Sequence, residues 1–393
     1  MGRLRPGHDP GGLPVHFSET DSLLQETFRR FALERLLPDY LRWQSEPFPA
    51  DLRRELAEIG VMGLSVPEEY GGSASTYVQL GIAAEELARG DFNVASFLQL
   101  NAIASMLLGG ADESLKRRWL PAVASGEATI AFALTEPEVG SDAARLRTRA
   151  VREGDDFVIT GEKASITFAG YADLCLVFAR SGGEGARGIS LFAVPLDLPG
   201  VSRQVYPSPG GRMTSRGSLH FDDVRIPADH QIGAEGTGFI GAMKAFDFNR
   251  AVIALACVGA AAQSLDETVE YAKNREAFGR PIARHEGVAF QIAEHLTRVH
   301  AARLLAYEVM ELADSGEPHT TQAAMCKWYG PKVSAEAIHA CVVLHGWPGY
   351  GSDLPLMQRM NDVIGLEIGD GTPEIMKGII SREVMGREYT AYR

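Results

Sequence analysis

The sequence predicts a mainly helical protein in which a central antiparallel β domain lies between two helical regions. Apolar residues recur at helical spacing from about residue 18 to residue 126. Between about residues 128 and 232, short β-rich runs alternate with Gly, Asp and Ser. Long helical patterns return after residue 238. We therefore expect three domains: an N-terminal helical domain at residues 1–126, a middle β domain at 127–235 and a C-terminal helical bundle at 236–393.

In the first domain, helical spacing is clearest at residues 23–31 and 80–87, and prolines and a Gly71-Gly72 pair mark the turns. No long helix interrupts the middle domain, which disfavours a βαβ dinucleotide-binding fold and favours a small barrel-like sheet. Its strands are expected at residues 129–134, 157–160, 174–179, 189–194, 201–206 and 219–221.

The last domain contains five helical patterns, and the final four are amphipathic with short connections, which predicts a four-helix bundle. The helices are expected at residues 239–274, 287–314, 320–344, 355–368 and 374–385.

Composition excludes several classes of function. The 393 residues carry a formal net charge of −13 and no Lys/Arg-rich block, which argues against binding to nucleic acid. The longest apolar run, residues 251–262, is shorter than the roughly 20 residues of a membrane-spanning helix. Residues 1–14 lack the apolar core of a secretory signal. We therefore expect a soluble, cytoplasmic protein without membrane contact.

The cysteines and histidines do not form a pattern typical of a metal site. Four cysteines lie far apart in the sequence, without a Cys-x-x-Cys pair, and are expected to be reduced and buried. His295 and His300 are five residues apart, which places them on different faces of a helix. We expect no bound metal.

The most informative segment is residues 368–377, which place one carboxylate, Asp370, in a tight turn between two expected helices. Gly369 and Gly371 permit unusual backbone angles, Thr372 can cap the next helix, and Pro373 suits its first position. Taken alone, the turn is explained more often by a solvated Asp between two helices than by a catalytic base.

Four further motifs, at residues 131–142, 221–227, 246–250 and 271–282, occur in the same order in a known family. Together with the Asp370 turn, they make nearly the whole chain resemble the acyl-CoA dehydrogenases, which are flavoproteins. The resemblance implies noncovalent FAD between the sheet domain and the bundle, and a homo-oligomer, tetramer or dimer. Arg275 and Phe278 then serve the pyrophosphate and adenine half of FAD, often across subunits.

The resemblance also assigns residues to the two ligands. For Thr135 and Ser141 a capped strand end is the alternative explanation, and for Arg275 an interaction with the helix dipole. Asp247 and Arg250 either position the thioester or only pair across one helix turn. The implied substrate-binding residues are Ser141, Phe246, Asp247, Arg250 and Gly371. The implied cofactor-binding residues are Phe132, Leu134, Thr135, Gly140, Ser141, Ser165, Thr167, Arg275, Phe278, Gly346, Thr372 and Glu374.

Three positions depart from the family pattern. Ser165 occupies a position where many relatives have a Trp against the flavin, and the loop at residues 345–351 matches imperfectly, so that only Gly346 is carried over. Asp370 stands where most relatives have Glu, and Asn249 stands where some relatives place their catalytic Glu. Asp370 is therefore the expected base, with a reach that is shorter by about 1.5 Å, a displacement large enough to affect catalysis.

The implied reaction is the dehydrogenation of an acyl thioester on coenzyme A or a carrier protein. Asp370 takes the α proton while a β hydride passes to flavin N5, and an electron-transferring flavoprotein accepts the electrons. The backbone N–H of Asp370 and a ribityl hydroxyl stabilise the enolate oxygen. The alternatives are an oxidase or monooxygenase similar to nitroalkane oxidases, a 1,4-dehydrogenation of a cyclic acyl thioester, and a helical scaffold without catalysis.

Overall fold

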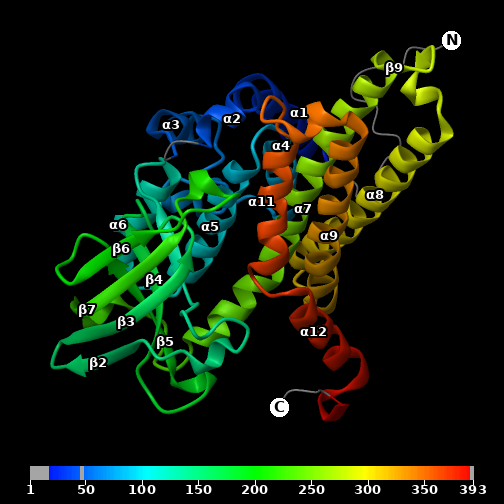
Figure 1. Ribbon diagram of the computed structural model, residues 1–393. Helices are drawn as coiled ribbons and strands as arrows, with labels where there is room; N and C mark the ends of the chain where they lie inside the picture. Colours follow the sequence, from blue (N-terminus) through cyan, green and yellow to red (C-terminus); the bar gives the residue numbers. More distant parts are fainter. Residues whose placement is uncertain (1–16, 45–47, 390–393) are drawn as a thin grey trace.

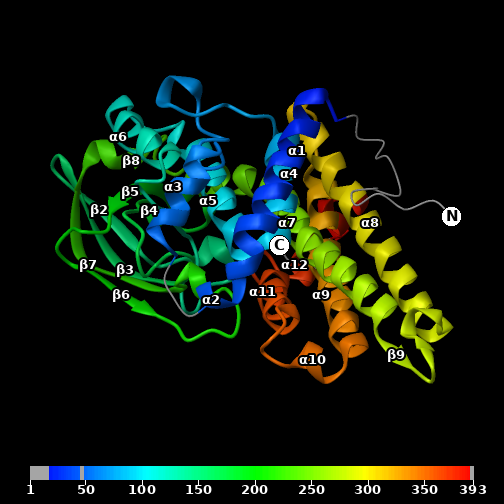
Figure 2. The same cartoon turned by 90° about the horizontal axis from the view of Figure 1, so that it is seen from above.

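The computed structural model describes residues 17–44 and 48–389. The sheet domain lies on one side of the molecule and the C-terminal helices lie on the other, as Figure 1 shows. Figure 2 shows that α5 lies between these two parts, with α1 and α4 beside the bundle. The site at residues 369–372 therefore lies in a region where all three predicted domains meet.

The N-terminal region is helical, as the sequence predicts. Two helices begin with a capping box, Ser18 with Asp21 and Thr76 with Gln79, which satisfies free N–H groups at the helix start. In α5 every residue except Ser96 and Met106 is buried, because this helix packs between the sheet and the bundle. The helices are α1 (Glu19–Phe31), α2 (Tyr40–Trp43), α3 (Ala50–Glu58), α4 (Tyr77–Gly90), α5 (Phe92–Leu108) and α6 (Glu113–Ala124).

The middle region forms one eight-stranded sheet in the order β6-β7-β3-β2-β4-β5-β8, with β1 paired to β4. Most pairs are antiparallel as expected, but β1 and β2 each pair with β4 in parallel. Strand β2 was not expected, because its two apolar residues, Ala150 and Val151, are adjacent and give no alternating pattern. The strands are β1 (Ile130–Ala133), β2 (Arg149–Glu153), β3 (Asp156–Ile166), β4 (Leu174–Arg180), β5 (Ile189–Pro195), β6 (Val201–Val205), β7 (Gly217–Pro227) and β8 (Gln231–Ile232).

The five long C-terminal helices agree with the expected ranges to within one residue at each end. A small hairpin of β9 (Glu276–Ala277) and β10 (Arg280–Pro281) joins the first two, and the short α10 (Trp347–Tyr350) precedes the fourth. Figure 1 shows α7, α8, α9 and α11 packed side by side, while α12 extends beyond the bundle. The long helices are α7 (Gly238–Asn274), α8 (Glu286–Asp314), α9 (Thr320–His345), α11 (Leu356–Ile368) and α12 (Pro373–Met385).

Helix α7 is the central helix of the fold. Within the described residues it is the one helix long and apolar enough to cross a membrane by length and composition, but 89% of the apolar 18-residue window that meets this criterion is buried inside the protein. It passes so close to α4 that a Cβ at Gly259 would come within 2.0 Å of the Glu85 carbonyl oxygen. The apolar character of α7 is thus explained by packing against its neighbours.

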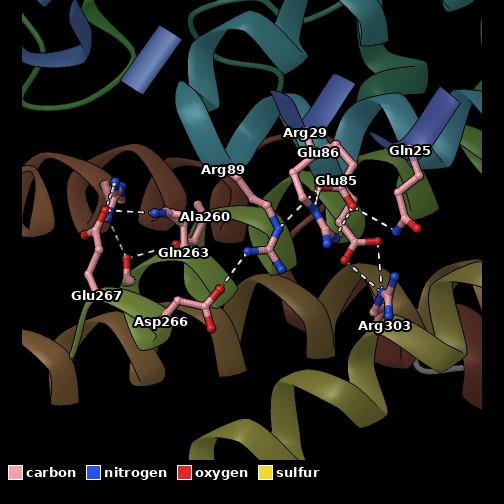
Figure 3. A network of polar contacts seen from close by, with 12 residues as sticks. Gln25, Arg29, Glu85, Glu86, Arg89, Ala260, Gln263, Asp266, Glu267 and Arg303 are labelled. Atoms are coloured by element: carbon pink, nitrogen blue, oxygen red, sulfur yellow. Dashed lines mark hydrogen bonds and ion pairs between the residues drawn. The ribbon is translucent and has the colours of Figure 1, made fainter. Parts of the chain in front are cut away.

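A network of buried charges joins α1, α4 and α8 (Figure 3). Glu86 is fully buried and accepts two hydrogen bonds from Arg29, at 2.7 and 2.6 Å. Glu85 accepts hydrogen bonds from Arg303 Nε at 3.0 Å and from the Tyr307 hydroxyl at 2.8 Å. Each of these two glutamates therefore has a guanidinium as a direct partner.

Candidate functional site

The turn between α11 and α12 holds Asp370 in an unusual backbone conformation. The φ angle of Asp370 is +56°, a left-handed value that Asp tolerates better than most side chains. Gly371 has φ +105°, and a Cβ there would lie 2.4 Å from Met376 Cε. Gly369 has φ −62° and needs no glycine, so the expectation for this residue was wrong. The strained residues of the turn are Asp370 and Gly371.

The start of α12 matches the sequence-based expectation. Thr372 is the N-cap residue, and its hydroxyl oxygen accepts a hydrogen bond from the Ile375 N–H at 3.4 Å. Pro373 is the first helical residue. Thr372 is half-buried, whereas Glu374 is exposed in the first turn of the helix. The turn that carries Asp370 thus leads directly into a capped helix.

The carboxylate of Asp370 is half-buried and points toward amide groups from two other helices. Gln99 Nε2, from α5, donates to Asp370 Oδ2 at 2.9 Å. Asn249 Nδ2, from α7, lies 3.5 Å from the same oxygen. Asp370 therefore does not face bulk water as an isolated turn residue, and neutral donors orient it.

Three cations lie close enough to influence Asp370 electrostatically. Burial lowers the pKa of Arg216, Arg250 and Lys327, and the negative charge of Asp370 opposes this shift in each case. Among the described residues no cation forms an ion pair with Asp370 itself. The cations donate instead to other acceptors: Lys327 Nζ to the Gly371 carbonyl oxygen at 2.7 Å, Arg250 Nη1 to Asp247 Oδ1 at 2.7 Å, and Arg216 Nη1 to the Ser165 carbonyl oxygen at 3.2 Å.

Asp247 and Arg250 form an ion pair across one turn of α7. The second carboxylate oxygen of Asp247 accepts a hydrogen bond from Thr320 Oγ1 at 2.8 Å. The structure thus confirms the pairing that the sequence left as one of two interpretations. Arg250 Nε and Asn249 Oδ1 are buried without a partner among the described residues. Unpaired polar atoms of this kind are typical of sites that bind a further molecule.

The segment at residues 131–142 forms a rigid edge of the sheet domain. The Thr135 carbonyl oxygen accepts from the Ala164 N–H at 2.9 Å, next to an irregularity in the pairing of β3 with β7. Ser165 follows with φ +58° and an exposed side chain, while Thr135 and Thr167 are half-buried. Gly140 and Ser141 are exposed.

A buried ion pair stabilises the segment at residues 131–142. Lys163 Nζ donates to Glu136 Oε1 at 2.9 Å and to the Leu134 carbonyl oxygen at 3.1 Å. Glu136 also accepts the backbone N–H groups of Arg147 and Thr148. Burial lowers the pKa of Lys163 to about 8, against the attraction of Glu136. The ion pair thus holds the segment that follows β1 and carries Thr135.

Aromatic packing connects the same strand to α7. The Phe132 ring lies 4.8 Å from the Phe178 ring and 5.5 Å from the Phe246 ring, measured between centroids. Phe246 and Leu134 are buried. These residues form part of the packing between the sheet domain and the bundle.

Arg275, Phe278 and Gly346 lie far from Asp370 within one chain. At roughly 1.5 Å per residue, the stretch of α7 from Asp247 to Arg275 spans about 42 Å. Figure 1 shows the β9 hairpin and the α11–α12 turn at opposite ends of the bundle. The Phe278 side chain is 96% exposed and Arg275 is exposed. The structure therefore does not bring these residues together with the base in a single chain.

Two cavities of the described chain lie away from Asp370. One, of about 410 Å³, is bordered by α11 and the N-terminal helices, and the other, of about 530 Å³, lies between α8, α9 and α12. The four cysteines are buried free thiols. Among the described residues, no group of three or more His, Cys, Asp or Glu side chains has an arrangement suited to a metal ion.

Sequence reasoning did not single out Gln99, Lys327 or Arg216. Gln99 and Lys327 share one usable signal, a buried polar side chain with an apolar residue on each side of it in the sequence. Arg216 has no such signal, because its role depends on how a turn before β7 approaches the α11–α12 turn.

Three acyl-CoA dehydrogenase domain models match the chain: the N-terminal domain at residues 18–127, the middle domain at 131–224 and the C-terminal domain at 236–385. The chain is 32% identical over 374 residues to the caffeyl-CoA reductase–Etf complex subunit CarC of Acetobacterium woodii, covering 93% of this chain and 98% of that protein.

Two solved structures illustrate the structural similarity. A glutaryl-CoA dehydrogenase of Mycobacterium smegmatis in complex with FADH2 has a TM-score of 0.90 and 28% identity, covering 96% of this chain and 97% of its own. The prolyl acyl carrier protein oxidase AnaB has a TM-score of 0.89 and 25% identity, covering 94% and 99%.

Proposed function

The chain belongs to the acyl-CoA dehydrogenase family, whose members are FAD-dependent oxidoreductases acting on CH–CH bonds, and we propose that Asp370 is its catalytic base. In this proposal the protein converts an acyl thioester on coenzyme A to the enoyl thioester. Bound FAD supplies the hydride acceptor. The observation that carries the proposal is the position of Asp370, half-buried and held by amide groups.

The environment of Asp370 suits a base. Three cations lie near the carboxylate, and its charge acts on the pKa of each of them. Because each cation bonds to another acceptor, no guanidinium or ammonium covers the carboxylate oxygens. The carboxylate can therefore take the α proton, while the electron pair of that C–H bond forms the new double bond. The amides of Gln99 and Asn249 fix the direction from which it acts.

The residues of the flavin motifs fit a dinucleotide with a polar ring edge and a pyrophosphate. Half-buried hydroxyls at Thr135 and Thr167 can bond to ring or ribityl oxygens, and the exposed Ser165 leaves open space at the sheet edge. Arg275 is an exposed guanidinium of the kind that binds phosphate oxygens in a bidentate way. We therefore retain the twelve cofactor-binding assignments, from Phe132 to Glu374, as part of the proposal.

The distance along α7 supports a homo-oligomer. Arg275 lies about 42 Å from Asp247 along α7, Phe278 follows in the hairpin beyond it, and Gly346 follows His345, which Tyr271 contacts near the same end of α7. These residues serve a flavin site only if that site belongs to a neighbouring subunit. Gel filtration with light scattering would test this, and a monomeric flavin-loaded protein would contradict it. The three domain boundaries and the cytoplasmic location stay predictions.

An electron-transferring flavoprotein is the proposed acceptor, because CarC is named as a subunit of an Etf complex. Oxidase activity on a thioester is the second candidate, because the similar protein AnaB is named an acyl carrier protein oxidase. The exposed Ser165, in place of the large Trp of many relatives, is the feature of this chain that favours access for oxygen.

The experiment is an anaerobic titration of the flavin-loaded protein with acyl-CoAs of varied length, branching and ring content, followed by mass spectrometry. The proposal predicts bleaching of the flavin absorbance and a product that has lost two hydrogen atoms. Rapid reoxidation by air with peroxide formation would favour the oxidase. A preparation that retains no flavin, or a flavin that no acyl-CoA or acyl carrier protein thioester reduces, would contradict the proposal.

A further inference from the structure

We propose that Lys327 is a positioning residue for Asp370, holding the turn that carries the base and supplying part of its electrostatic environment. This inference rests on the proposed role of Asp370 as the base. Lys327 belongs to the first half of α9, far from Asp370 in the sequence, and its side chain is wholly buried. Its ammonium group donates a hydrogen bond to the Gly371 carbonyl oxygen at 2.7 Å.

The geometry of the turn explains why such a bond is useful. Asp370 has a φ angle of +56°, which a residue with a side chain adopts only where surrounding contacts hold it, whereas the φ angle of +105° at Gly371 is accessible to glycine. Gly371 follows the base directly in the sequence. A donor that fixes the Gly371 carbonyl group therefore fixes the direction of the Asp370 side chain and of the Asp370 backbone N–H.

The character of the donor is the second part of the argument. Burial of an ammonium group is unfavourable, and burial lowers the pKa of Lys327 while the charge of Asp370 opposes this effect. The other ionisable groups that act on Lys327 are the thiols of Cys257 and Cys326 and the guanidinium of Arg250. A neutral amide or hydroxyl could hold the carbonyl oxygen without that cost. The positive charge is therefore expected to serve Asp370 as well.

Three substitutions separate the two contributions. Lys327→Arg keeps the charge and the donor, Lys327→Gln keeps a donor without the charge, and Lys327→Met removes both. Each flavin-loaded variant is mixed anaerobically with the acyl-CoA that reduces the wild-type flavin. The limiting rate of flavin reduction, its pH profile and the apparent dissociation constant of the substrate are measured by stopped flow.

We expect Lys327→Met to slow flavin reduction about 10- to 100-fold with substrate affinity nearly unchanged, since a displacement of about 1 Å at a reacting group has effects of this size. The acid limb of its pH profile should move to higher pH, because loss of a nearby positive charge makes a carboxylate easier to protonate. Lys327→Gln should recover part of the rate but not the pH profile, and Lys327→Arg should recover both.

The matched control is Arg303→Met, which removes another buried cation from the bundle, in the Glu85 network shown in Figure 3. It should lower the melting temperature without changing the rate or the pH profile. A wild-type rate and pH profile in Lys327→Met would overturn the inference. If Lys327→Met does not fold, Lys327→Gln provides the test. The inference is overturned if this variant has the wild-type rate of flavin reduction and the wild-type acid limb of the pH profile.

A different result would contradict the proposed function. If Asp370→Asn reduces its flavin at the wild-type rate, Asp370 is not the base. If Asp370→Asn is inactive while the Lys327 variants behave as wild type, the base assignment holds and only the role of Lys327 is wrong.

Discussion

Two regions of this protein surround a buried or half-buried carboxylate with cations, but they do so differently. In the network of α1, α4 and α8, Glu86 is bonded directly by Arg29, and Glu85 by Arg303. At the α11–α12 turn, Asp370 is bonded by amides, and the three cations around it are bonded to other acceptors. The first arrangement compensates buried charge; the second provides charge without covering the carboxylate.

The difference has a chemical consequence. A carboxylate in a direct ion pair is strongly stabilised in its ionised form and is a weaker base. Asp370 is held by neutral donors instead, and no cation of the described residues bonds to its carboxylate oxygens. Charge pairing therefore distinguishes a group that holds helices together from a group available for proton transfer.

The largest expected effect is on catalysis at the turn. Asp370→Asn keeps the size and the hydrogen-bonding capacity of the side chain but removes its basicity. We expect substrate to reduce the flavin about 10²- to 10⁴-fold more slowly, the range typical of general base catalysis, with little change in thermal stability. Stopped-flow reduction and a thermal melt check the two parts. If Asp370→Asn lost much of its thermal stability but its flavin were reduced at the wild-type rate, Asp370 would have a structural role and not a catalytic one.

The matching change in the network should affect stability instead. Glu85→Gln removes the carboxylate that forms an ion pair with Arg303, and both side chains are almost fully buried. Breaking a buried ion pair in this way costs about 3–5 kcal/mol. Denaturant unfolding at neutral pH measures this loss, and the flavin-loaded variant should reduce at the wild-type rate. A slower reduction at full flavin occupancy would show that the network also serves the site.

A third buried ion pair, between Lys163 and Glu136, extends the comparison, because it predicts how the free energy of unfolding depends on pH. Burial lowers the pKa of Lys163 from 10.5 in the unfolded chain to about 8 in the folded protein. Between these values the unfolded chain binds more protons, so that this lysine raises the free energy of unfolding as pH increases, by at most about 1.4 kcal/mol per pH unit.

The measurement is the difference in unfolding free energy between wild type and Lys163→Met from pH 7.5 to 10. In the wild type, the attraction of Lys163 and the contacts with Thr148 and Arg147 outweigh burial and lower the pKa of Glu136 below its usual 4.5. As pH rises above 8, the free energy of unfolding of the wild type should increase relative to that of Lys163→Met. A constant difference would mean that Lys163 keeps its proton across the range.

Much of the fold could be predicted from local sequence patterns. The five C-terminal helices were placed to within a residue because their apolar periodicity and end signals are local, as Thr372 and Pro373 show at the start of α12. Strand β2 was missed because Ala150 and Val151 are adjacent between two arginines, so that no apolar alternation marks this mostly exposed strand. Parallel pairing with β4 depends on long-range contacts that no local pattern contains.

The candidate site was predicted less completely. Asp370 could be singled out because its turn and four further motifs together resemble a known family, whereas the turn alone favours a solvated Asp. Gln99 and Lys327 reach it from α5 and α9, and only the packing of these helices brings them there. The remote position of Arg275 and Phe278 also became evident only from the length of α7.

The most direct test of the central claim isolates the proton transfer from the hydride transfer. The substrate is an acyl-CoA analogue with hydrogens on the α carbon and none on the β carbon, incubated with flavin-loaded protein in D₂O and followed by NMR. The wild type should exchange the α hydrogens for deuterium, and Asp370→Asn should not exchange them above the uncatalysed rate. Exchange at the wild-type rate in Asp370→Asn would show that another group removes the proton.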